Sequence, residues 1–122
     1  MAKILLVEDD ETGRYALSKY LTRAGHEVTE AEDGEIAFKL FRGESFDIVI
    51  TDIVMPNVEG IELVNLLLEI QPDIPIIGIS GGGRLEGAGY LKLIKALGAS
   101  ATLEKPFEPE ALLALVDQFM SS

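Results

Sequence analysis

Acidic side chains come directly after an apolar segment near the start of the chain. In ILLVEDDET, residues 4–12, four apolar residues lead into Glu8, Asp9, Asp10 and Glu11. Neighbouring like charges raise one another's pKa and oppose folding unless hydrogen bonds, helix ends or a cation compensate them. This stretch therefore predicts that a positive partner lies against the acidic residues.

Three further residues with charged or hydroxyl side chains follow later apolar segments: Asp52 after FDIVIT, Ser80 after IGI and Lys105 after ATLE. A cluster of oxygen ligands suits Mg²⁺, which keeps several waters and binds a few carboxylates together with a phosphate. Such a cation would neutralise the carboxylates and leave Asp52 able to attack a phosphoryl group, as in aspartyl-phosphate chemistry. Ser80 and Lys105 would hold the phosphoryl oxygens, because phosphoryl transfer depends mainly on positioning and charge neutralisation.

The segments that must position these side chains have the composition of buried strands. Short apolar runs with turn residues behind them are typical of strands covered on both faces, as in parallel sheets. The predicted strands cover residues 3–7, 28–31, 46–51, 74–79 and 101–103.

Helical periodicity fills the intervals between the predicted strands. Apolar residues recur three or four positions apart, with Gly25 as a stop, Asp33 as an N-cap and Pro109 in a first turn. The predicted helices cover residues 16–24, 34–41, 61–68, 91–97 and 109–119.

This alternation predicts an α/β, doubly wound fold. Strands that alternate with helices imply right-handed crossovers and a parallel sheet with helices on both faces. Such sheets bind ligands at the carboxyl ends of their strands. The side chains that follow the strands should therefore converge on one edge of the sheet, namely those of Glu8, Asp9, Asp52, Ser80 and Lys105.

Composition narrows the classes of partner. The chain of 122 residues has the length of one domain, and 48% of its residues are hydrophobic, which supports a substantial core. Its formal net charge of −11 argues against binding of nucleic acid by this domain alone and against anionic membranes. There is no cysteine, and no secretory signal or membrane-spanning run is recognisable, so we expect a cytoplasmic protein.

The motifs ILLVEDD, DIVITDIVMPNVEG, IGIS and GASATLEKPF together resemble those of response-regulator receiver domains of two-component signalling. The resemblance covers essentially residues 1–122 and is closest to single-domain chemotaxis regulators. It implies a flavodoxin-like sheet of five parallel strands in the order 2-1-3-4-5, the order known for the chemotaxis member of that family.

The resemblance also implies roles for individual residues. Asp52 would be the phosphoacceptor, and Asp9, Asp52 and the main-chain carbonyl of Val54 would ligate Mg²⁺. Glu8 would act mainly through metal-bound water. The peptide between Lys105 and Pro106 would be cis. The domain would then be no enzyme but a phosphoacceptor that assists its own phosphorylation and dephosphorylation.

The implied partners are a histidine kinase or phosphotransfer protein and a downstream protein effector. Two alternatives remain: a receiver-like interaction domain that takes no phosphate, and an aspartate-nucleophile phosphatase of the haloacid-dehalogenase type. The phosphatase needs a second aspartate two residues after the nucleophile, where this chain has Val54. The presence of all five predicted site residues argues against the unphosphorylated domain.

Two segments leave the switch mechanism open. The glycine-rich stretch at residues 79–89 lacks the spacing of a dinucleotide fingerprint or a P-loop, so we expect a flexible loop. Receivers often carry an aromatic residue three positions before the lysine, where this chain has Thr102. The signal would pass either through this smaller residue or through Ser80 and the loop. His26 is predicted to lie at the surface with no role.

Overall fold

The structure, a computed structural model, describes residues 1–53, 60–80, 95 and 98–121. In chain order its elements are β1 (Lys3–Val7), α1 (Glu11–Arg23), β2 (Glu27–Ala31), α2 (Gly34–Gly43), β3 (Ile48–Asp52), α3 (Gly60–Ile70), β4 (Ile76–Ser80), β5 (Ala101–Glu104) and α5 (Pro109–Met120).

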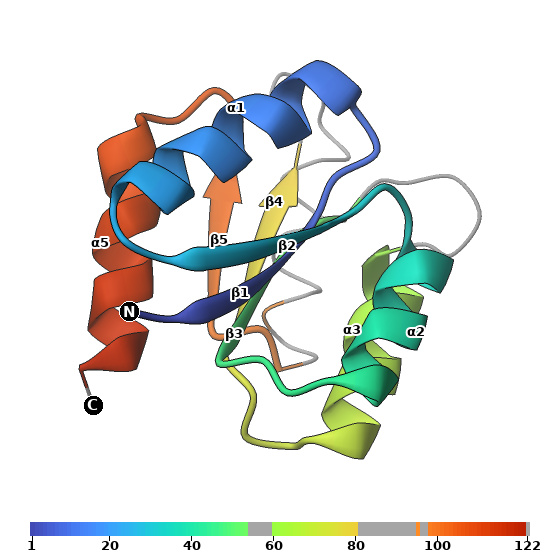
Figure 1. Ribbon diagram of the computed structural model, residues 1–122. Helices are drawn as coiled ribbons and strands as arrows, with labels where there is room; N and C mark the ends of the chain where they lie inside the picture. The colour runs from blue at the N-terminus through green and yellow to red at the C-terminus, as the bar shows by residue number, and fades with distance from the viewer. Residues whose placement is uncertain (54–59, 81–94, 96–97, 122) are drawn as a thin grey trace.

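The strands form one parallel sheet of five strands in the order β2-β1-β3-β4-β5 (Figure 1). One face of the sheet packs against α1 and α5, and the other packs against α2 and α3. The predicted α/β, doubly wound architecture and its strand order are confirmed.

The three central strands, β1, β3 and β4, are almost entirely buried. Because side chains alternate between the two faces of a strand, Ile4 and Leu6 enter the core beneath α1 and α5. Leu5 and Val7 enter the core beneath α2 and α3. Burial on both faces explains the unbroken apolar runs in the sequence, and it fixes the positions at which the strands end.

Two aspartates set the beginnings of helices. Asp10 precedes α1, and its side chain accepts a hydrogen bond from the Gly13 N–H at 2.9 Å. Asp33 caps α2 as predicted, accepting from the Ile36 N–H at 2.9 Å. Both caps satisfy N–H groups that lack partners within the helix. Beyond the other end of α1, Gly25 has a positive φ of 98°, which agrees with its predicted role as a stop.

Two strands begin later than the sequence predicted. β4 begins at Ile76, because Pro75 has no N–H to contribute to a strand ladder. β3 begins at Ile48, and Phe46 instead stacks on the ring of Phe41 in α2, with 6.2 Å between ring centroids. The carboxyl ends of these strands, where the predicted site lies, differ from the prediction by a single residue.

The helix predicted over residues 91–97 lies outside the described residues, apart from the helical Lys95. Residues 81–89 of the glycine-rich stretch also lie outside them. Within the described ranges, no helix combines the length and the apolar character needed to cross a membrane.

Candidate functional site

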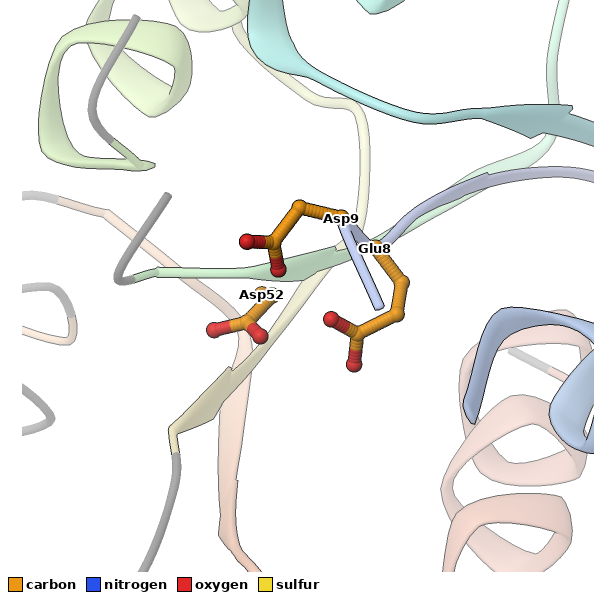
Figure 2. Close-up of side chains that lie close together, drawn as sticks. All are labelled: Glu8, Asp9 and Asp52. Atoms are coloured by element: carbon orange, nitrogen blue, oxygen red, sulfur yellow. The ribbon is translucent and has the colours of Figure 1, made fainter. Parts of the chain in front are cut away.

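Three carboxylates meet where β1 and β3 end. Glu8 and Asp9 follow β1 directly, and Asp52 is the last residue of the neighbouring strand β3. Each of the three offers an oxygen atom, and these atoms lie within 4.8 Å of one another. Figure 2 shows the carboxylates directed toward one another. Glu8 and Asp52 are buried while Asp9 is exposed, so the cluster is open to solvent on one side.

Lys105 brings a positive charge to the cluster from the chain after β5. Its Nζ donates a hydrogen bond to Glu8 Oε1 and lies 3.4 Å from Asp52 Oδ2. The main-chain N–H of Lys105 donates to the Ser80 carbonyl at 2.8 Å, which ties this loop to the end of β4. The peptide between Lys105 and Pro106 is cis, as the resemblance implied. Lys105 is therefore a positive partner within the chain for the acidic residues, as the sequence predicted.

The Ser80 hydroxyl completes the set of predicted side chains. Ser80 is the last residue of β4 and is fully buried. Its Oγ has no hydrogen-bond partner among the described residues. A buried hydroxyl without a partner loses its hydration without compensation, so this atom suits a polar group that arrives with a ligand.

The electrostatics show that the lysine compensates the carboxylates only in part. Burial, together with the hydrogen bond and charge of Asp52, raises the pKa of Glu8 in spite of Lys105. Although its side chain is exposed, partial loss of hydration and the adjacent Glu8 raise the pKa of Asp9. Burial by itself lowers the pKa of Lys105, but its hydrogen bond with Glu8 and the charge of Asp52 raise it overall. The cluster therefore still favours additional positive charge.

Local hydrogen bonds orient the main chain around Asp52. The Thr51 hydroxyl donates to the Asp52 carbonyl at 2.8 Å, and the Ile53 N–H donates to the Ile79 carbonyl at 2.8 Å. The first bond lies within β3 and fixes the peptide after Asp52, and the second holds the end of β3 against β4. The direction of the Asp52 side chain is consequently set by the sheet and by the first residue beyond it.

Gly60, at the start of α3, is a site-supporting residue that the sequence analysis missed. Its N–H donates to the Ile53 carbonyl at 2.9 Å. A Cβ atom at this position would lie 2.3 Å from the Ile53 Cα and 2.5 Å from the Ile53 carbonyl oxygen, both main-chain atoms. Only glycine allows this approach. The glycine that closes DIVMPNVEG was the available signal, but the spacing alone does not reveal what lies opposite.

The chemistry of the donor set fits a magnesium ion. Mg²⁺ prefers oxygen ligands and retains waters, and the cluster offers carboxylate oxygens with one open side. Val54, whose carbonyl was predicted as a further ligand, lies outside the described residues. Glu8, Asp9 and Asp52 are brought together as predicted, with Lys105 among them.

The fold and the cluster at the strand ends agree with a family whose sequence pattern this chain matches. Residues 4–117 match the family described as the response regulator receiver domain. The chain belongs to this family and is a receiver domain of the kind found in two-component systems.

Relatives and solved structures extend the match. The response regulator protein FleR of Pseudomonas aeruginosa is 38% identical over 117 residues, covering 94% of this chain and 24% of FleR. The chain thus spans about a quarter of that relative's length. The chemotaxis protein CheY of Thermotoga maritima is 33% identical over 117 residues, covering 95% of both proteins.

Among solved structures, the Vibrio cholerae chemotaxis protein CheY4 aligns with a TM-score of 0.84 at 33% identity, covering 98% of both chains. A receiver domain protein from Clostridium thermocellum aligns with a TM-score of 0.91 at 28% identity. That alignment covers 99% of this chain and 95% of the other. These neighbours share the flavodoxin-like fold of this chain.

Proposed function

We propose that residues 1–122 form a phosphorylation-dependent receiver domain that accepts a phosphoryl group on Asp52 with the help of Mg²⁺. The observation that carries this proposal is the convergence of Asp52 and Lys105 in an acidic cluster at the strand ends. Ser80, whose hydroxyl has no hydrogen-bond partner among the described residues, ends the neighbouring strand β4. An anionic group that needs an ammonium, a hydroxyl donor and a cation would find all three requirements met at one strand edge.

Asp52 is the nucleophile in this proposal. One of its carboxylate oxygens forms a bond to phosphorus, while the bond from phosphorus to the donor's nitrogen or oxygen breaks and the donor leaves with that electron pair. The product is an acyl phosphate on Asp52. Glu8, Asp9, Asp52 and the Val54 carbonyl would hold the Mg²⁺, with Glu8 acting mainly through metal-bound water. When bound, the ion neutralises charge and orients the phosphoryl oxygens.

Lys105 and Ser80 stabilise the phosphorylated form. The Lys105 ammonium already lies 3.4 Å from Asp52 Oδ2. A short movement would bring it to an oxygen of a phosphoryl group bound to that carboxylate. The Ser80 hydroxyl would donate to a second phosphoryl oxygen and gain the partner that it lacks among the described residues. These movements of Ser80 and Lys105 would shift the ends of β4 and β5. Phosphorylation could in this way change a protein-interaction surface beside these strands.

The partners in this proposal follow from the family. A histidine kinase or phosphotransfer protein supplies the phosphoryl group, and a protein effector reads the switched surface. The net charge of −11 supports partners other than nucleic acid or membrane lipid for this domain alone. A cytoplasmic location, where such kinases present their phosphohistidine, belongs to the same proposal.

Incubation with acetyl phosphate and Mg²⁺, followed by intact mass measurement and peptide mapping, tests the proposal. We expect one phosphoryl adduct on the peptide that contains Asp52 and none in Asp52→Asn. Asp47→Asn, in the segment just before the same strand, serves as the matched control and should be modified like the parent. A parent that gains no mass, or an adduct on another residue, would contradict the proposal and favour the unphosphorylated interaction domain.

A further inference from the structure

Arg14, in the first half of α1, contacts the acidic strand end without taking part in the carboxylate cluster. Its Nη1 donates a hydrogen bond to the main-chain carbonyl of Glu8 at 2.9 Å. Its Nε donates to Glu30 Oε1, on β2, at 3.2 Å. The arginine side chain is only 15% exposed, so it is held in this position rather than moving freely in solvent.

The carbonyl that Arg14 binds belongs to the peptide between Glu8 and Asp9. A peptide unit is planar and includes the Cα atoms on both of its sides. Fixing the orientation of this one plane therefore constrains the directions in which both carboxylates leave the main chain. Glu8 lies just beyond the end of β1, and the guanidinium of Arg14 donates to its carbonyl there.

The neighbouring groups are fixed by other bonds. The Glu8 N–H donates to the Ala31 carbonyl at 3.1 Å, and the Asp10 N–H donates to Glu8 Oε2 at 3.3 Å. These contacts hold the peptide units before and after the one between Glu8 and Asp9. Arg14 supplies the bond to the middle unit.

We propose that Arg14 is a positioning residue for the acidic pair, and that Glu30 keeps its guanidinium in place. Arg14 thereby sets the affinity of the pair for a divalent cation without touching the cation. This inference rests on the proposed function, because it concerns the Mg²⁺ that Glu8 and Asp9 are proposed to hold.

A simple charge effect predicts the opposite result from positioning. Arg14 places a positive charge beside a site for a divalent cation, so by Coulomb's law alone its removal would strengthen Mg²⁺ binding. Loss of the hydrogen bond would weaken binding, because the carboxylates lose their common orientation. The direction of the change therefore separates the two explanations.

The surroundings of Arg14 allow substitution without steric conflict. The side chain borders a hollow of about 350 Å³, which is also lined by Glu11, Thr12, Tyr15 and Glu30. Lysine keeps the charge but presents a single compact ammonium, which cannot reproduce the fork that spans Glu8 and Glu30. Arg14→Lys thus removes the two-sided hydrogen bonding to Glu8 and Glu30 but keeps the positive charge. Arg14→Gln removes both the hydrogen bonding and the charge.

The first experiment measures Mg²⁺ affinity by isothermal titration calorimetry, at a temperature where circular dichroism shows every variant to be folded. We expect Arg14→Lys and Arg14→Gln to weaken binding about tenfold, the size of effect seen when groups that orient metal ligands are lost. Arg23→Gln, which removes one charge from the far end of the same helix, is the control and should bind as the parent does or slightly more tightly. Unchanged affinity in Arg14→Lys, or tighter binding in Arg14→Gln, would overturn the inference.

A second measurement needs no metal. Backbone amide relaxation by NMR should show greater mobility at Asp9 and Asp10 in Arg14→Lys than in the parent, with Ile50 in β3 unchanged. Glu30→Gln, which weakens the hold on the intact guanidinium, should show a smaller effect in both experiments. A parent that binds no Mg²⁺ refutes the proposed function, whereas normal binding and normal mobility in Arg14→Lys refute the positioning role alone.

Discussion

Two lysines, one where the strands begin and one where they end, have nearly equal exposure but very different surroundings. Lys3, at the start of β1, is 32% exposed, and Lys105, beyond the end of β5, is 33% exposed. The carboxylates beside Lys3 belong to Glu27 and Glu44, which are 60% and 38% exposed. Those beside Lys105 belong to Glu8 and Asp52, which are 2% and 8% exposed.

This difference shows that the burial of the carboxylates, rather than of the lysine, distinguishes the surface ion pairs of Lys3 from the carboxylate cluster at Lys105. Solvated carboxylates gain little from a lysine, because water already stabilises their charge. Buried carboxylates depend on it, because they have lost that hydration. The carboxylates near Lys3 therefore need no further cation, whereas the cluster beside Lys105 still favours added positive charge.

The largest expected effect is a difference in the free energy of unfolding between variants of the two lysines. In metal-free buffer at pH 7, we expect Lys105→Ala to lower the free energy of unfolding by about 2 kcal/mol, because it leaves buried carboxylates uncompensated. Lys3→Ala should cost much less, as is typical of exposed pairs. Urea denaturation measures both values. Equal losses in the two variants would remove the distinction between the two ends.

The next effect concerns Mg²⁺. At a concentration ten times its dissociation constant, the ion should raise the free energy of unfolding of the parent by about 1.4 kcal/mol. Asp9→Asn should abolish this gain while the protein stays folded, because the cluster loses a ligand. Asp47→Asn, which alters a carboxylate near Lys3, should retain the full gain. Thermal scans with and without Mg²⁺ check the pair, and a gain that persists in Asp9→Asn would exclude that residue as a ligand.

The smallest expected effect is a dependence on pH. The pKa values of Glu8 and Asp9 are raised in the folded state. Their contribution to the free energy of unfolding is therefore fully present when the pH lies below their ordinary pKa values, and it is lost as the pH rises through the raised values. Metal-free protein should therefore become less stable as the pH rises from about 4.5 toward neutrality. Glu8→Gln or saturating Mg²⁺ should flatten the slope in urea titrations. A slope of the opposite sign would mean that Lys105 already overcompensates the cluster.

The sequence predicted the site at the level of strand ends. Apolar runs buried on both faces are unmistakable, and the residue after such a run lies at the edge of the sheet whatever the exact register. The sequence therefore predicts that Glu8, Asp9 and Asp52 converge, and the structure confirms it. The same reasoning anticipated Lys105 near Asp52 but not its hydrogen bond with Glu8.

The missed features depend on which element lies opposite another. Arg14 reaches Glu8 because α1 packs over the end of β1, and Gly60 is required because α3 begins against Ile53. His26 was assigned no role, yet its Nδ1 accepts a hydrogen bond from the Ala2 N–H at 3.1 Å. Local periodicity carries no information about such distances between elements, so a single sequence could not reveal them.

The contact between Lys105 and Glu8 joins residues that are 97 positions apart. A ribosome therefore produces the acidic residues early and their internal counter-charge late. A nascent chain that has emerged only as far as β3 can already pair β1 with β3, and this pairing brings Glu8 and Asp52 together without the ammonium. Repulsion penalises that premature pairing, and the addition of the edge strand β5 relieves it. The carboxylate cluster therefore gains its internal counter-charge only once the edge strand β5 has joined the sheet.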